Sequence, residues 1–276
     1  MDILKWHNKY STDIRLVYNS EATKNNYKSQ VLSFLNYFKN EIEPKSIDNE
    51  KIKLWLLEAK TINSRKHRLC ALNSFYKITV GMPSKIKKIP YPKSERKLPI
   101  VLSVEEVQRM FTVCDNLKHK VILSLLYSCG LRVSELINLK WLHIDRSRMI
   151  INIIAGKGNK DRQVMLDGSL IPILEKYYFK YKTKTYVLKG QFSEQYSATS
   201  VNQVMKQLAD KAKINKRVYT HLMRHNCFTH LVEAGIDINL IQKLAGHSNV
   251  KTTLLYTHIS HNLISRIQSP LGVITI

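Results

Sequence analysis

Apolar residues recur at helical spacing through the first 80 residues of the chain. We expect one helix from Ser20, its N-cap, to about Asn40. Its apolar face consists of residues at mostly three- and four-residue intervals: Tyr27, Val31, Phe34, Leu35 and Phe38. Two more helices are expected, one opened by Ser46 or Asp48 and running to Leu57, the other spanning about 63–80 and ending near Gly81. The aromatic residues fit a core better than a base-stacking surface. Residues 1–82 are therefore predicted to form a small all-helical domain with an aromatic core.

Residues 83–99 interrupt this pattern with four prolines: Pro83, Pro90, Pro92 and Pro99. Proline resists both helix interiors and central strands, so we expect a basic linker or clamp segment here. A second domain, 100–260, is predicted to open with a capping box formed by Ser103 and Glu106. Its first three helices are expected at about 104–114, 118–128 and 133–139.

The period then changes to short β-rich runs at 141–145, 149–154 and 162–166. The last two are joined by the turn-rich residues 156–161, which favours a three-stranded antiparallel sheet. Helical patterns resume at about 169–181, 199–212, 221–233, 239–244 and 251–256. The predicted fold class is therefore mainly α (α+β), with a helical first domain and an α-rich second domain that holds a small sheet.

Charge indicates the kind of partner. The 276 residues include 44 Lys and Arg against 21 Asp and Glu, a net charge of +23. Such an excess favours a polyanionic partner, with nucleic acid first and an anionic membrane surface second. No apolar run approaches the roughly 18 residues of a membrane span, and the first residues lack the apolar core of a signal peptide. We therefore expect a cytoplasmic DNA-binding protein.

The positive charge is concentrated between Lys60 and Lys97, where eleven basic residues face a single acidic one, Glu95. This strip is typical of a phosphate-backbone contact surface. The residues expected to contact DNA are Lys60, Arg65, Lys66, Arg68, Lys85, Lys87, Lys88, Lys93, Arg96 and Lys97.

Four cysteines occur without any C-x-x-C pairing: Cys70, Cys114, Cys129 and Cys227. They lie within apolar patterns, so we expect buried reduced thiols and no disulfide framework.

The last third of the chain carries most of the candidate chemistry. His221, Arg224 and His225 share one helix face. Two histidines at this spacing also occur in zinc proteases, but Leu222 replaces the glutamate that such a motif needs, and an arginine between the ligands would repel a dication. No metal is therefore predicted. His225, beside core-like neighbours, also fits a supporting structural role.

Two further segments are weak signals taken alone. Arg132 opens a helix, where a guanidinium beside free backbone N–H groups makes an anion site, and Glu135 one turn later is placed to hold it. Lys157 stands between two glycines in the 156–161 turn, from which a lysine can reach into a cleft. That segment is not a Walker A motif, which excludes a nucleotide site of that type.

Taken together in chain order, these pieces resemble the tyrosine recombinase (phage integrase, Xer-like) family. The resemblance spans about residues 98–260 and rests on five blocks: Gly130-Leu-Arg-Val-Ser-Glu-Leu136, Gly156-Lys-Gly-Asn-Lys-Asp-Arg162, His221-x-x-Arg224-His225, Gly246-His247 and Tyr256-Thr-His258. Met223 and Ala245 stand where leucine is common in the family. The first domain resembles the family's core-binding domain only in size, position and charge.

The resemblance implies a site-specific recombinase that cleaves and rejoins DNA through a 3′-phosphotyrosyl intermediate, without cofactor, metal or ATP. It implies catalytic roles for Arg132, Lys157, His221, Arg224, His247 and the nucleophile Tyr256, with Glu135 and His225 in support. Arg132, Arg224 and His247 would bind the scissile phosphate. His221 is the candidate base for the phenol and Lys157 the candidate acid for the leaving 5′-oxygen.

The resemblance also implies double-stranded DNA with a core recombination site as partner, and a tetramer in the synaptic complex. The apolar tail 261–276 is expected to dock on a neighbouring protomer, with docking on its own protomer as the alternative. Two rival functions remain open: a DNA relaxing enzyme similar to type IB topoisomerases, and a non-catalytic DNA-binding protein of the same fold. Target sequence, accessory factors and the choice among integration, excision, inversion and chromosome-dimer resolution are not fixed by these residues.

Overall fold

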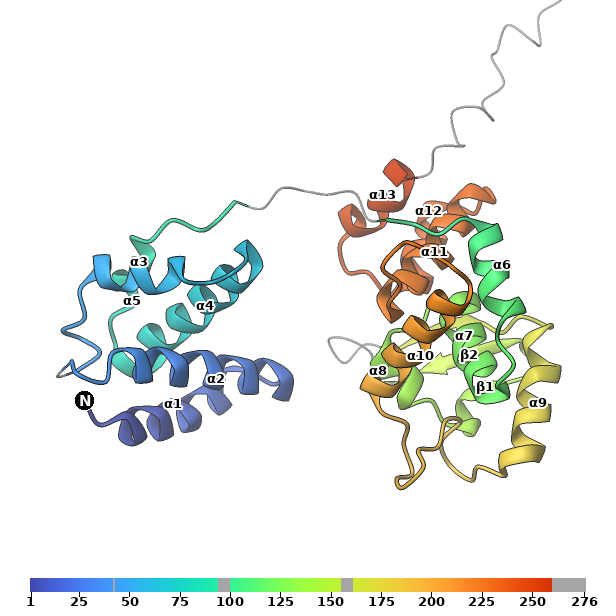
Figure 1. Ribbon diagram of the computed structural model, residues 1–276, viewed down its shortest axis with the longest axis horizontal. Coiled ribbons are helices and arrows are strands. Elements are labelled where there is room, and N and C mark those ends of the chain that lie inside the picture. The colour runs from blue at the N-terminus through green and yellow to red at the C-terminus, as the bar shows by residue number, and fades with distance from the viewer. Residues whose placement is uncertain (42, 94–99, 155–160, 260–276) are drawn as a thin grey trace, which may run out of the picture. The chain divides into compact units, whose positions relative to one another are not determined.

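A computed structural model describes residues 1–41, 43–93, 100–154 and 161–259. The chain divides into two compact units, Met1–Lys97 and Leu98–Ile276 (Figure 1). No helix within the described ranges is long and apolar enough to cross a lipid bilayer.

The first unit is entirely helical over its described residues. Its elements are α1 (Ile3–Val17), α2 (Glu21–Tyr37), α3 (Asn49–Leu57), α4 (Ile62–Phe75), the π-helix η1 (Tyr76–Val80) and α5 (Pro83–Lys87). Ser20 caps α2 by accepting from the Thr23 N–H, and Asp48 caps α3 by accepting from the Glu50 N–H. Gly81, with φ of +78°, ends η1 in the left-handed conformation.

Aromatic side chains form the core of this unit, as predicted. The ring of Phe34 lies 5.2 Å from that of Trp55 and 6.2 Å from that of Tyr76, and all three residues are buried. Their edge-to-face geometry is typical of core aromatic pairs. These rings therefore hold the helices together and are not available to stack on bases.

The first unit differs from the sequence prediction at its end. The predicted linker begins with a helix, α5, because proline fits the first turn, where its missing N–H costs no hydrogen bond. Ile86 and Ile89 are buried in the aromatic core, and α5 packs against α4. The predicted helix 63–80 is also not uniform, since its last five residues form the π-helix η1.

The second unit is α-rich with one small sheet. Its helices are α6 (Val104–Thr112), α7 (Leu117–Ser128), α8 (Val133–Ile137), the 3₁₀ helix η2 (Trp141–His143), α9 (Leu170–Tyr181), α10 (Ala198–Lys211), α11 (Thr220–Glu233), α12 (Ile238–Ala245) and α13 (Val250–Ile259). The predicted capping box is present at α6, where Ser103 and Glu106 each accept the other's backbone N–H.

The sheet has the order β1 (Ile144–Asp145), β2 (Ile150–Ile153), β3 (Arg162–Met165), and both pairings are antiparallel, as predicted. The first predicted strand is wrong over its first three residues, which form η2. The Trp141 N–H donates to Thr185 O at 3.2 Å, outside the sheet, so the ladder starts only at β1.

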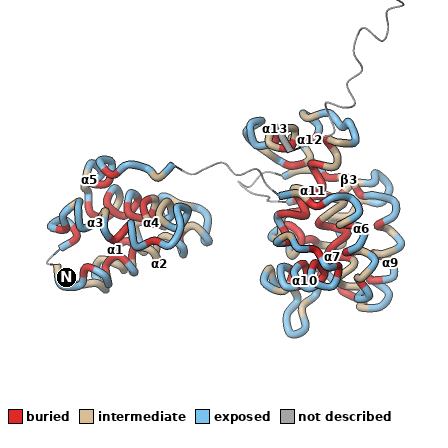
Figure 2. The backbone as a smooth tube through the Cα atoms, turned by 45° about the horizontal axis from the view of Figure 1, so that its top comes forward, coloured by how far each residue is buried: buried red, intermediate tan, exposed pale blue. Residues whose placement is uncertain are grey.

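Helices α7 and α11 run through the interior of the second unit, as the buried colouring of both helices shows (Figure 2). Helices α12 and α13 pack against α11 and against each other, and α12 also contacts β3. The candidate catalytic residues at the N-terminus of α8, on α11, in the turn after α12 and on α13 are thus brought together by the core.

Candidate active site

Arg224 is the buried centre of the site. Its side chain on α11 is 1% exposed, and its guanidinium donates from Nη1 to Gly130 O at 2.6 Å and from Nη2 to Ala245 O. Burial, together with the charges of Arg132 and Arg162, lowers its pKa to about 10, so it stays positively charged at neutral pH.

Gly130 is required for this contact. Its φ is +57°, and a β-carbon there would lie 2.6 Å from the ring of Phe228. The same ring lies under the Arg224 guanidinium, 4.8 Å from its central carbon. A larger residue at 130 would push the ring or the carbonyl away, so the glycine sets the position of the arginine.

Arg132 is the N-cap residue of α8, where the sequence places an anion site. Its guanidinium donates from Nη1 to Glu135 Oε1 at 2.7 Å and from Nη2 to Ala245 O at 3.2 Å. Burial raises the pKa of Glu135, but hydrogen bonds from Arg162 and Arg132 outweigh it and hold that pKa at about 2. Glu135 is therefore a fixed anion beside two cations.

The C-terminus of α12 gathers three arginines. Ala245 O accepts from both Arg132 and Arg224, and Leu244 O accepts from Arg162 Nε at 2.8 Å. The last carbonyls of a helix lack partners within the helix and carry partial negative charge, which stabilises nearby cations. This helix end fixes the spacing of the guanidinium groups.

Arg162 has no assigned role in the sequence prediction, although it closes one of the five blocks. The structure places it inside the site, with both terminal nitrogens on Glu135. Its only sequence signal is its position at the start of a predicted strand, directly after the glycine-rich turn. An arginine there reads as a surface residue until the fold brings Glu135 to it.

His247 joins the arginines to the tyrosine. It follows Gly246, whose φ is +60°, and its Nε2 lies 3.4 Å from Arg224 Nη2. On its other side, Nδ1 is hydrogen-bonded to Thr253 Oγ1 at 3.0 Å. Burial and the charges of Arg224 and Arg132 lower the pKa of His247 to about 4, so its ring is neutral at pH 7.

Tyr256 is 1% exposed on α13 and stacks on His247, with ring centroids 6.1 Å apart and planes at 20°. Phe228 and His225 each lie 5.7 Å from it. Burial raises the pKa of the phenol to about 12, although Arg224 opposes the shift. The phenol is protonated at neutral pH, and a nucleophilic role therefore needs a base.

His221 and His225, two of the histidines of α11, form a chain of ring contacts to the tyrosine. His221, which is exposed, lies edge-on to His225 with centroids 4.6 Å apart, and His225 contacts Tyr256. Burial, then the neighbouring His221 and Arg224, lower the pKa of His225 to about 4. Its buried Nδ1 has no hydrogen-bond partner among the described residues.

Five of the six predicted catalytic residues are described, and the contacts above bring all five together: Arg132, His221, Arg224, His247 and Tyr256. Lys157 lies outside the described residues. A hollow of about 1080 Å³ opens beside Arg132, Arg162 and His247, bordered by α12. Of the described catalytic candidates, Arg132 and His247 line it.

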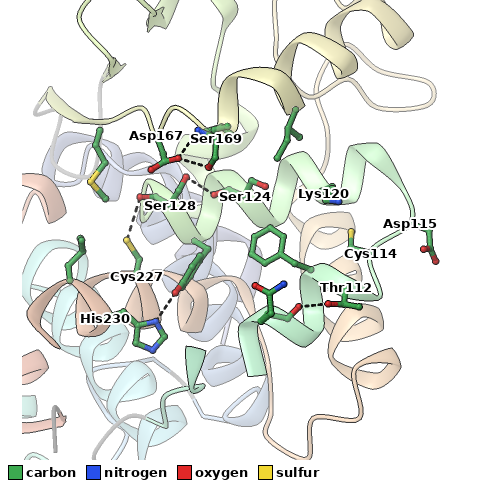
Figure 3. Close-up of a pocket in the computed structure, with 17 residues that line it drawn as sticks. Thr112, Cys114, Asp115, Lys120, Ser124, Ser128, Asp167, Ser169, Cys227 and His230 are labelled. Atoms are coloured by element: carbon green, nitrogen blue, oxygen red, sulfur yellow. Dashed lines mark hydrogen bonds between the residues drawn. The ribbon is translucent and has the colours of Figure 1, made fainter. Parts of the chain in front are cut away.

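A second cavity of about 990 Å³ is lined by residues of α6, α7, α9 and α11, including Ser124, Cys227 and His230, and by Asp167 between β3 and α9 (Figure 3). None of the five described catalytic candidates lines it. His230 Nε2 donates to Leu102 O at 3.0 Å, and its Nδ1 is hydrogen-bonded to Tyr127 Oη at 2.8 Å. This histidine fastens the segment before α6 to the catalytic helix.

The predicted DNA-contact residues of the first unit fall into three groups. Exposed ones are Lys60, Lys87, Lys88 and Lys93, and half-buried ones are Arg65, Lys66, Arg68 and Lys85. Arg96 and Lys97 lie outside the described residues. Arg68 donates to Trp55 O at 2.7 Å and stacks on its ring, so it also supports the fold.

Comparison with known proteins identifies the family. Residues 101–262 match the model of the phage integrase family. The chain is 34% identical over 271 residues to a putative integrase/recombinase of Sinorhizobium fredii, covering 95% of this chain and 87% of that one. It is 33% identical over 257 residues to a tyrosine recombinase of Thermosipho africanus, covering 87% and 90%.

Solved structures agree. A crystal structure of XerA recombinase covers 96% of this chain and is covered completely, at 26% identity and a TM-score of 0.57. The fold is also that of a lambda integrase dimer bound to a core site, with a TM-score of 0.76 at 16% identity over 91% of this chain and 97% of that one. The chain belongs to the phage integrase family and is a site-specific recombinase of the tyrosine type, with DNA as its partner.

Proposed function

We propose that this recombinase binds a specific duplex core site and exchanges strands there, with Tyr256 as the nucleophile. One observation supports the assignment most strongly. Arg132 and Arg224 share the carbonyl of Ala245, Arg224 reaches His247, and His247 stacks on Tyr256. Two cations, a hydrogen-bonding ring and a phenol in continuous contact are suited to phosphoryl transfer to tyrosine.

The arginines are proposed to bind the non-bridging oxygens of the scissile phosphate. Each guanidinium has five N–H donors, and the contacts to Ala245 O, Gly130 O and Glu135 leave others free for phosphate. Because both groups are already held by the protein, they stabilise the extra charge of the transition state without reorganising.

Tyr256 is proposed to attack phosphorus. A bond forms between its oxygen and phosphorus, the bond from phosphorus to the 5′-oxygen breaks, and a 3′-phosphotyrosyl link remains. The phenol proton passes to His221 as base, and the leaving oxygen takes a proton from Lys157 as acid. Attack by a 5′-hydroxyl reverses these steps, so rejoining needs no ATP.

Strand exchange requires two duplexes, so we further propose a tetramer on DNA, with the tail 261–276 docking on a neighbouring protomer. Because its substrate is DNA, we propose that the protein acts in the cytoplasm. Removing residues 262–276 is expected to abolish the tetrameric DNA complex in sedimentation while leaving binding to one site intact. Unchanged assembly would contradict the role of the tail, which lies outside the described residues.

The related recombinases favour strand exchange over simple relaxation, and one experiment separates the two. A preferred duplex is first selected from a random library by binding, then two copies are placed on a supercoiled plasmid. We expect deletion or inversion products that depend on both copies. Relaxation of a plasmid that lacks the sequence, without such products, would instead support a topoisomerase-like activity.

The role of Lys157 has its own test. Lys157→Ala is expected to cleave slowly when the leaving group is a normal 5′-hydroxyl. A 5′-bridging phosphorothioate leaves without needing a proton, so it should restore the rate of this variant. If the sulfur substrate gives no rescue, Lys157 is not the general acid.

A further inference from the structure

Arg162 is a buried arginine that the proposed mechanism does not use. Its side chain, at the start of β3, is 7% exposed. Nη1 and Nη2 donate to the two oxygens of Glu135, the second at 2.8 Å, and Nε donates to Leu244 O at 2.8 Å. Each of the three nitrogens thus donates to a protein acceptor, and the buried side chain makes its contacts mainly within the protein.

Its aliphatic part packs against the turn that carries His247. Gly246 has a φ of +60°, and a β-carbon there would lie 2.8 Å from Arg162 Cδ. The arginine thus contacts the N-terminus of α8 through Glu135, the C-terminus of α12 through Leu244, and the turn before His247. These places hold Arg132, the Ala245 carbonyl that Arg132 and Arg224 share, and His247.

The carboxylate of Glu135 is shared by two arginines. Arg132 takes one oxygen with its side chain and the other with its backbone N–H, while Arg162 takes both with its side chain. A buried carboxylate that loses one of its cations depends on the remaining one to compensate its charge. Without Arg162, Glu135 would hold the guanidinium of Arg132 more strongly and compete with the phosphate for its donors.

We propose that Arg162 is a positioning residue of the phosphate clamp: it neutralises Glu135 and fixes the end of α12, so that Arg132 and His247 face the scissile phosphate. This inference rests on the proposed function. Arg162 differs from a residue of an ordinary structural ion pair because its effect on cleavage runs through Arg132. The size of that effect therefore depends on the charge of the scissile phosphate.

The test compares Arg162→Met and Arg162→Lys with Arg132→Ala and with the double variant. DNA affinity, thermal midpoint and single-turnover cleavage of a nicked suicide duplex are measured for each. The duplex carries either a normal phosphate or a neutral methylphosphonate at the scissile position. Arg146→Met is the matched control, since Arg146 forms an exposed pair with Glu175 outside the site.

On the normal phosphate, Arg162→Met is expected to cleave about 100-fold more slowly than the wild type with unchanged DNA affinity, the loss typical of a misplaced catalytic group. Arg162→Lys keeps the positive charge, so its cleavage rate is expected to lie between those of the wild type and Arg162→Met. On the methylphosphonate, which needs less positive charge, the loss should fall below about tenfold. The double variant should be no slower than Arg132→Ala within about threefold.

Equal losses on both substrates, or additive losses with Arg132→Ala, would overturn the inference. So would normal cleavage by Arg162→Met. If Arg162→Met does not fold, Arg162→Lys decides on the same two substrates. Wild-type protein that makes no covalent adduct on the normal phosphate would overturn the proposed function itself, which distinguishes that failure from this one.

Discussion

The ring of His247 is hydrogen-bonded through Nδ1 to the hydroxyl of Thr253, at 3.0 Å, and Thr253 is completely buried. Arg224 has only donors, so its contact with Nε2 makes that nitrogen an acceptor and leaves the proton on Nδ1. A bound phosphate needs the opposite arrangement, with Nε2–H as donor. Because a hydroxyl can donate or accept, Thr253 allows this change while the ring stays neutral.

We expect Thr253→Val to lose both roles of the hydroxyl at nearly the same volume. Cleavage should fall about tenfold, the effect of one hydrogen bond, while DNA affinity stays the same. Thr253→Ser is the control and should keep the wild-type rate. Single-turnover cleavage of a suicide duplex measures the effect, and an unchanged rate in Thr253→Val would show that the hydroxyl does not set the tautomer.

Glu135 predicts a pH dependence of stability. Its pKa falls from the ordinary 4.5 to about 2 in the folded state. A lowered pKa gives stability that is present above the unfolded value and lost as the pH falls through the folded value. By linkage the lowered pKa contributes about 3 kcal/mol to the free energy of unfolding at neutral pH. The folded state therefore gains most from Glu135 above pH 5.

Denaturant unfolding of the wild type and of Glu135→Gln between pH 2 and 7 measures this term. The difference in free energy of unfolding between the two proteins should be largest at neutral pH and shrink by about 3 kcal/mol as the pH falls from about 5 to about 2. A difference that is independent of pH would mean that the carboxylate is not stabilised by Arg162 and Arg132.

His225 and His221 are expected to differ in role. His225→Phe keeps a ring against Tyr256 and removes a buried nitrogen that has no partner among the described residues, so stability should stay the same or rise by about 1 kcal/mol. Its cleavage rate should stay within tenfold of the wild type. His221→Ala, which removes the proposed base, should cleave about 100-fold more slowly than the wild type. If His225→Phe loses as much, the base is His225.

Lys87, the last residue of α5, and Lys88 after it are exposed and offer a test of DNA contact. Lys87→Gln with Lys88→Gln should reduce the slope of log affinity against log salt by about 0.9 for each lost phosphate contact. Arg68→Ala should instead lower the thermal midpoint, because Arg68 binds Trp55 O. Anisotropy titrations at several salt concentrations measure the slope, and an unchanged slope would remove these lysines from the interface.

Much of the site was predictable because its signals are local. Glu135 follows Arg132 by one helical turn, a spacing that becomes informative together with the other blocks, and the capping box at Ser103 needs only four residues. The order of the sheet also follows from short β-rich runs separated by turns. These features depend on neighbours in sequence, which a single chain displays directly.

Other features depend on residues far apart and left no local signal. Nothing near Arg162 indicates that it meets Glu135, 27 positions away. Gly130 looks like a helix terminator, yet the ring of Phe228 also requires it. The helix α5 was missed because Pro83 and the three prolines after it suggested a linker, whereas Ile86 and Ile89 find partners only in the folded core.

The central claim is that Tyr256 becomes covalently joined to DNA. Wild-type protein and Tyr256→Phe should be incubated with a nicked suicide duplex of the selected core sequence, and any adduct digested and sequenced by mass spectrometry. We predict a 3′-phosphotyrosyl adduct on the peptide that contains Tyr256 for the wild type. Tyr256→Phe should bind the duplex equally well and form none. An adduct formed by Tyr256→Phe, or one mapped to another tyrosine, would contradict the account.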